Sequence, residues 1–158
     1  MPVDRQLRYA SMFRGSTLAR EPSDQVAIVT CMDCRIDPVA VFGLERGEAH
    51  VIRNAGGVVN DEVIRSLSIS QHTLGTTGVL IVQHIGCGLE GLDDEEYLRL
   101  MDRTAGRRPT WQPGGFADAE ASLRRSMEVV RNSPFLLVRD NVRGAILDTL
   151  NGGIREVV

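Results

Sequence analysis

The chain has 158 residues, and 18 Lys and Arg residues against 21 Asp and Glu residues leave a formal net charge of −3. A chain of this length is expected to form one domain, residues 1–158, that buries roughly 68–70% of the surface of the unfolded chain. Hydrophobic residues at 42% and charged residues at 25% are ordinary globular values and exclude a disordered or fibrous chain. The slightly negative net charge argues against a nucleic-acid-binding domain, which is expected to be basic. The longest apolar runs, such as Val26–Val29 and Val79–Val82, are far too short for a membrane span.

Three cysteines are present, Cys31, Cys34 and Cys87. No apolar stretch follows the first five residues, so nothing resembles a secretory signal and we expect a cytoplasmic protein without a membrane partner. An odd number of cysteines without an export signal favours metal binding or catalysis over a disulfide framework.

Short apolar segments in chain order predict a mostly parallel sheet. Because their apolar residues are continuous rather than alternating, these strands are expected to be covered on both faces. The predicted strands are Gln25–Cys31, His50–Arg53 and Gly78–His84, with one or two more from Val142–Leu150 and Gly153–Val158. We expect a three-layer α/β domain with helices on both faces and about four parallel strands in the order 2-1-3-4. The last segment allows an antiparallel edge strand.

Helices are predicted between the strands. Asn60 is expected to cap a helix that starts with acidic residues and ends at Gly75. The acidic run that begins at Asp93 predicts a second helix start. Asp118–Arg131 predicts a third helix whose buried side holds Ala121, Met127 and Val130.

Polar residues with metal-ligating side chains follow the first and third strands. Ligands of open α/β sheets sit beyond the carboxyl ends of the strands, where the strand order reverses. In the order 2-1-3-4 this point lies between strands one and three, so Cys31 is expected to face His84 and Cys87. Two thiolates and one imidazole suit Zn²⁺ and leave a fourth tetrahedral position open, which is the mark of a catalytic site.

Asp33 and Arg35 flank the first proposed ligand. Alternation along an extended tip places them on the side of Cys31 and sends Cys34 to the other side, so Cys34 is predicted to be a spectator. At a surface such a salt bridge contributes little to stability. Beside a metal, however, Arg35 is expected to keep Asp33 ionised, and Asp33 to orient the water on zinc.

With these residues in place the sequence resembles the β-class carbonic anhydrases. Their signature is Cys-x-Asp-x-Arg followed by His-x-x-Cys, and both halves are intact here, at Cys31–Arg35 and His84–Cys87. The resemblance continues through His50–Gly57 and covers most of Gln25–Gly91. It implies one zinc ion per subunit and a homodimer or dimer of dimers with its cleft near the subunit interface. It also implies an N-terminal arm over residues 1–24, with a helix within residues 4–20 that reaches over the partner.

The resemblance implies two reactions for one zinc site. The first is reversible hydration of CO₂ to bicarbonate by a zinc-bound hydroxide. The compact subgroup of the family also resembles relatives that hydrolyse carbonyl sulfide or CS₂, which is the alternative. A site with two thiolates and a neutral His has zero formal charge and acidifies water less than an all-His site, which reaches a pKa of about 7. Activity is therefore expected to rise with pH. In some members of the family the residue equivalent to Asp33 closes onto zinc at low pH.

Two other classes of protein remain open at this point. A structural zinc module would need a fourth ligand from Asp33 or Cys34. A thiol redox protein would use Cys31 and Cys34 as a C-x-x-C pair, which leaves the later His84 unexplained.

Gly56 and Gly57 have two interpretations of equal weight. They form a strand-to-helix turn that needs unusual backbone angles, or they let the backbone approach the substrate pocket.

Overall fold

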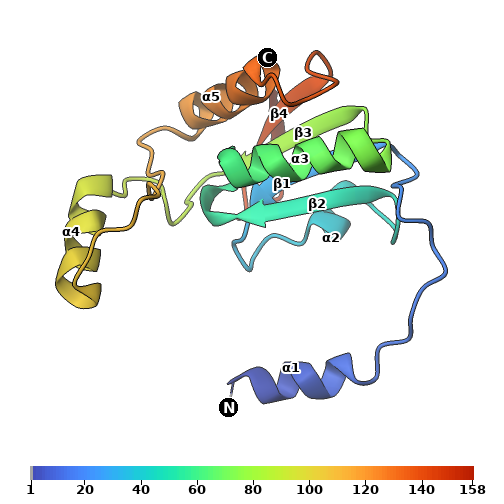
Figure 1. The fold of residues 1–158 in the computed structure, drawn as a ribbon, viewed down its shortest axis with the longest axis horizontal. Helices are drawn as coiled ribbons and strands as arrows, with labels where there is room; N and C mark the ends of the chain where they lie inside the picture. The colour runs from blue at the N-terminus through green and yellow to red at the C-terminus, as the bar shows by residue number, and fades with distance from the viewer. Residues whose placement is uncertain (1) are drawn as a thin grey trace.

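The computed structural model describes residues 2–158. Its centre is a five-stranded sheet in the order β2-β1-β3-β4-β5 (Figure 1). The first four strands are parallel, and β5 pairs antiparallel with β4. The strands are β1 (Val26–Cys31), β2 (Ala49–Asn54), β3 (Gly78–His84), β4 (Val142–Leu147) and β5 (Ile154–Val157). The predicted order, with its antiparallel edge strand, is confirmed.

Helices connect the strands and begin at capping side chains. The helices are α1 (Pro2–Ala10), α2 (Pro38–Phe42), α3 (Asp61–Leu74), α4 (Asp94–Ala105) and α5 (Ala119–Asn132), with a 3₁₀ turn η1 (Ala55–Gly57). The Asn60 side chain accepts a hydrogen bond from the Val63 N–H, and Asp93 and Asp118 cap α4 and α5 in the same way. Helix α3 ends at Gly75, whose φ of 73° is the left-handed conformation that glycine adopts without strain.

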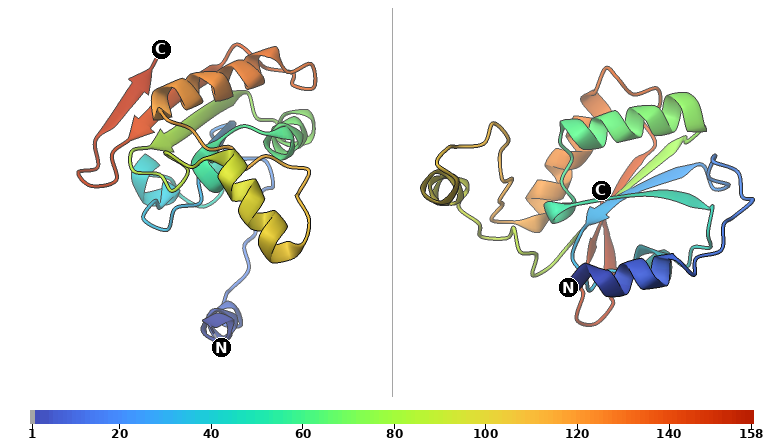
Figure 2. Two further views of the ribbon diagram at one scale, coloured as in Figure 1. Left: turned by 90° about the vertical axis from the view of Figure 1, so that its left-hand side faces the viewer. Right: turned by 60° about the horizontal axis from the view of Figure 1, so that its bottom comes forward.

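Helices α3 and α5 cover one face of the sheet, and α2 lies at the other (Figures 1 and 2). Contact with α5 is close, because a Cβ on Gly144 would lie 2.4 Å from the sulfur of Met127. The buried side of α5 includes Met127 and Val130 as expected, but Ala121 is exposed. The prediction for Ala121 was wrong because the inward positions of the first turns of α5 are Ala119, Ser122 and Leu123.

Helix α1 stands apart from the sheet and its covering helices (Figures 1 and 2). It ends at Ala10, so it is shorter than the helix expected within residues 4–20. Residues 3–20 are all exposed. Within the described part of the chain, no helix has the length and apolarity needed to cross a bilayer.

The fold brings three strand ends together. Because β2, β1 and β3 are parallel and adjacent, their carboxyl ends reach the same edge of the sheet. Cys31 pairs with Asn54 at this edge, and His84 is the last residue of β3. The segments that follow β1, β2 and β3 and carry the candidate site residues therefore begin at neighbouring strand ends.

Candidate metal centre

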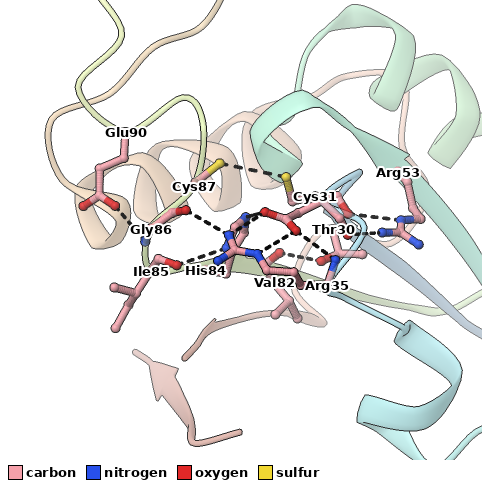
Figure 3. A network of polar contacts seen from close by, with 11 residues as sticks. Thr30, Cys31, Arg35, Arg53, Val82, His84, Ile85, Gly86, Cys87 and Glu90 are labelled. Carbon is pink, nitrogen blue, oxygen red and sulfur yellow. Dashed lines mark hydrogen bonds and ion pairs between the residues drawn. The ribbon is translucent and has the colours of Figure 1, made fainter. Parts of the chain in front are cut away.

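Cys31, His84 and Cys87 form a compact cluster at this edge of the sheet (Figure 3). One ligand atom from each residue lies within 4.8 Å of the others, and all three residues are buried. The two sulfur atoms of Cys31 and Cys87 are 3.9 Å apart, and both cysteines are free. The structure thus unites the three residues that the sequence assigned to a metal.

The imidazole of His84 is oriented as a ligand. Its Nδ1 lies 3.1 Å from the backbone oxygen of Ile85, and because a carbonyl only accepts, Nδ1 carries the proton. Nε2 is then left with a lone pair, and among the described residues it is buried without a hydrogen-bond partner. An unsatisfied buried nitrogen is costly unless a ligand occupies its lone pair.

The donor set fits zinc. Two thiolate sulfurs bound tetrahedrally to one Zn²⁺, each at about 2.3 Å, lie about 3.8 Å apart. The separation of 3.9 Å between the sulfurs of Cys31 and Cys87 matches this value. Burial raises the pKa of the Cys87 thiol above its ordinary value, so a nearby cation is required to favour the thiolate.

Asp33 and Arg35 form a bidentate pair beside the cluster. Arg35 Nη2 donates to Asp33 Oδ2 at 2.6 Å and Nε donates to Oδ1 at 3.0 Å, while the Arg35 backbone N–H donates to Oδ1 at 2.9 Å. These hydrogen bonds hold the pKa of the Asp33 carboxyl well below its usual range. Asp33 Oδ2 also lies 3.8 Å from His84 Nε2, so the ionised carboxylate borders the ligand cluster.

The segment after Cys31 leaves the strand and turns. The predicted extended tip is therefore absent, although Asp33 and Arg35 do reach the side of Cys31 and Cys34 is exposed. Arg35 Nη2 additionally donates to the Gly86 oxygen at 3.0 Å, which ties this turn to the loop between His84 and Cys87.

Two residues to which the sequence analysis assigned no role support these loops. Arg53 on β2 donates from Nε to the Cys31 oxygen at 3.1 Å and from Nη2 to the Asp33 oxygen at 2.8 Å. Glu90 accepts from the Gly86 N–H at 3.0 Å (Figure 3). The position of Arg53 at the end of the second predicted strand was a usable signal, whereas nothing in the pattern marked Glu90.

Gly56 and Gly57 form η1 directly after β2, with φ angles of 78° and 61°. The turn with unusual backbone angles is confirmed. A Cβ on Gly57 would lie 2.9 Å from the nitrogen of Cys31 and 2.9 Å from the carbonyl carbon of Thr30. The backbone of this turn therefore packs directly on the end of β1, behind the first ligand.

The other two classes of protein fit this arrangement less well. A structural site needs a fourth protein ligand, but Asp33 is held by Arg35 and the exposed Cys34 is not part of the cluster. A redox pair of Cys31 with Cys34 fits poorly because Cys31 is buried against Cys87 instead.

Comparisons with known proteins agree with this geometry. The family profile described as carbonic anhydrase matches residues 26–99. The chain is 43% identical over 149 residues to β-carbonic anhydrase 1 of Mycobacterium tuberculosis, covering 94% of this chain and 91% of that protein. It is 34% identical over 100 residues to a carbon disulfide hydrolase of Saccharolobus solfataricus, covering 63% of this chain and 49% of that protein.

A solved carbonic anhydrase from Streptococcus mutans has the same fold along nearly the whole chain. The superposition has a TM-score of 0.87 at 35% sequence identity, and it covers 99% of this chain and 95% of that one. This structural similarity agrees with the sequence matches. The protein belongs to the β-carbonic anhydrase family.

Proposed function

We propose that this protein catalyses the reversible hydration of CO₂ to bicarbonate. The single observation that carries the proposal is the convergence of the ligand atoms of Cys31, His84 and Cys87 with the Asp33 carboxylate at one edge of the sheet. The long match to a β-carbonic anhydrase supports the same reaction.

The proposed metal ligands are the sulfurs of Cys31 and Cys87 and Nε2 of His84. One zinc ion per subunit would supply Lewis-acid chemistry there, because it lowers the pKa of water and so provides a nucleophile near neutral pH. The Ile85 carbonyl holds the His84 proton on Nδ1, which keeps Nε2 available as a donor atom.

Asp33 is the proposed catalytic residue, and Arg35 positions it. The low pKa of Asp33 keeps its carboxylate an acceptor across the working pH range. It accepts a hydrogen bond from the attacking water-derived nucleophile and directs the lone pair toward the carbon of CO₂. Arg35 fixes the carboxylate through both oxygens, and its bond to the Gly86 oxygen restrains the pair relative to His84 and Cys87. The backbone of Gly56 and Gly57 is proposed to border the substrate pocket.

Hydrolysis of carbonyl sulfide or CS₂ is the alternative reaction for the same residues. The carbon disulfide hydrolase match is less extensive, because it covers 63% of this chain against 94% for the carbonic anhydrase. The test is stopped-flow CO₂ hydration near pH 8.5 on protein of known zinc content, with H₂S release from carbonyl sulfide and CS₂ measured on the same preparation. We expect fast hydration and little H₂S. Full zinc content with H₂S release and negligible hydration would select the alternative.

A homodimer, or a pair of dimers, is part of the proposal, with residues 1–24 as an arm on the partner subunit. Apolar arm side chains are exposed, namely Val3, Leu7, Tyr9, Met12, Phe13 and Leu18. A groove of about 630 Å³ lies on the sheet face opposite α3 and α5, and its lining includes Phe42, Leu80, Ala145 and Ile154. Exposed apolar surfaces of this kind mark association sites.

Light scattering at several concentrations tests the assembly. We expect the mass of two or four chains for the wild type and a lower mass for Leu7→Asp combined with Met12→Asp. An unchanged mass in the double variant would contradict a role for the arm. A reducing, cytoplasmic location completes the proposal, because the ligand cysteines Cys31 and Cys87 must stay unoxidised.

A further inference from the structure

A second cavity, of about 600 Å³, lies between α5, the loop that follows α4 and the segment that follows β2. Its volume is in the range of small-molecule sites. None of the three candidate metal ligands lines it. Its apolar wall includes Val58, Val129 and the ring of Trp111.

The charge of the cavity is positive. Arg125 is the one charged residue of its lining, and no Asp or Glu contributes to it. Within residues 2–158, the Arg125 guanidinium makes no ion pair or hydrogen bond, unlike that of its neighbour Arg124, which pairs with Glu120. An unpaired guanidinium beside an apolar wall is suited to a carboxylate that carries an apolar body.

The wall of the cavity also holds a serine hydroxyl. Ser122 is 3% exposed, and its backbone N–H donates to the Asp118 oxygen at 3.1 Å, while its hydroxyl makes no hydrogen bond among the described residues. Ser126, one turn further along α5, is satisfied by the Val59 N–H. The Ser122 hydroxyl is therefore available to donate a hydrogen bond to an anionic ligand in the cavity.

The cavity adjoins the end of β1 through Asn54. The Asn54 backbone oxygen accepts from the Met32 N–H at 2.8 Å, and its side-chain nitrogen donates to the Val58 oxygen at 2.8 Å. That bond fixes the amide orientation and leaves Asn54 Oδ1 buried without a partner among the described residues. Asn54 therefore links the wall of the cavity to the end of β1.

We propose that this cavity binds a small organic monocarboxylate with a ring-sized apolar body, independently of the metal centre. The carboxylate pairs with Arg125 and accepts from the Ser122 hydroxyl, and the apolar body lies against Val58, Val129 and Trp111. The proposal stands apart from the proposed function, because none of these residues belongs to the metal cluster.

Trp111 is the only tryptophan of the chain, so its fluorescence reports binding directly. The experiment titrates the zinc-loaded wild type with benzoate and with acetate, which carries the same charge without the ring. We expect saturable quenching by benzoate and at least tenfold weaker binding of acetate. Arg125→Gln and Ser122→Ala should each weaken benzoate binding about tenfold or more, with CO₂ hydration unchanged.

Arg139→Gln is the charge-matched control, because Arg139 is exposed in the loop before β4, away from this cavity. It should bind benzoate as the wild type does. Cys31→Ser distinguishes the two sites: benzoate binding should survive the loss of metal. No quenching at millimolar benzoate, equal affinity in Arg125→Gln and the wild type, or loss of binding in Cys31→Ser would each overturn the proposal.

Discussion

Arg35 binds both carboxylate oxygens of Asp33, at 2.6 Å and 3.0 Å, and its backbone N–H donates to the same carboxylate at 2.9 Å. The carboxylate that it holds lies 3.8 Å from His84 Nε2. Arg35 therefore fixes the position of the negatively charged Asp33 carboxylate relative to the ligand cluster. It does so through two donors of its planar guanidinium, a geometry that a lysine cannot provide.

Arg35→Lys should lower kcat/KM for CO₂ hydration by about 10- to 100-fold, the usual cost of losing a partner that orients a metal site. The charge is retained, so a large loss would show that the bidentate geometry matters rather than the charge alone. Stopped-flow kinetics and zinc analysis of the same samples provide the measurement. Activity within twofold of the wild type would contradict this role.

The lowered pKa of Asp33 predicts a pH dependence of stability. A carboxyl whose pKa is depressed by folding stabilises the protein above its unfolded pKa of about 3.9, and that contribution is lost as the pH falls through the lowered value. The difference in free energy of unfolding between the wild type and Asp33→Asn should be constant from pH 7 to pH 5. It should shrink below about pH 4. Urea denaturation tests this, and a difference that already shrinks between pH 7 and pH 5 would contradict the lowered pKa.

Gly57→Ala should destabilise the protein strongly. A side chain at φ 61° is strained by about 1–2 kcal/mol, and the added Cβ would also lie 2.9 Å from the backbone of β1. Overpacking of this kind adds about 1–3 kcal/mol. Gly91→Ala is the matched control, because its φ is 79° and its Cβ would meet nothing within 4 Å. Equal losses in the free energy of unfolding for the two variants would contradict the close packing on Cys31.

Glu90 supports the loop between His84 and Cys87 by accepting from the Gly86 N–H. Glu90→Ala removes that acceptor and should weaken zinc binding by about 10-fold or more. Glu90→Gln keeps an acceptor oxygen and should bind zinc nearly as the wild type does. Competition with a chelating dye measures both affinities. If Ala and Gln variants bind zinc equally well, the hydrogen bond contributes nothing to the metal centre.

The sequence was sufficient for the sheet and for the ligand cluster because both depend on local signals. Continuous apolar runs marked the strands, and Cys31 and His84 stand at strand ends that the order 2-1-3-4 makes neighbours. The cap at Asn60 was likewise a local pattern, because a side-chain oxygen there meets an N–H three residues later.

The contacts that support the site could not be predicted from the sequence, because they join side chains to backbone atoms elsewhere in the fold. The position of Arg53 at a strand end indicated that it lies near the site, but no spacing in the sequence shows that it binds the backbone oxygens of Cys31 and Asp33. The orientation of His84 depends on the Ile85 carbonyl, which a sequence does not display. Ala121 was wrongly predicted to be buried. Asp118 marks where α5 begins, but the periodicity of the sequence does not fix which side of this helix faces the sheet to within one residue.

We propose that Cys31, with His84 and Cys87, holds the zinc on which CO₂ hydration depends. The most direct test measures zinc content and stopped-flow hydration together in the wild type, Cys31→Ser and Cys34→Ser. We predict about one zinc per chain and fast hydration in the wild type and in Cys34→Ser, and the loss of both in Cys31→Ser. Retention of zinc and activity in Cys31→Ser, or loss of both in Cys34→Ser, would contradict it.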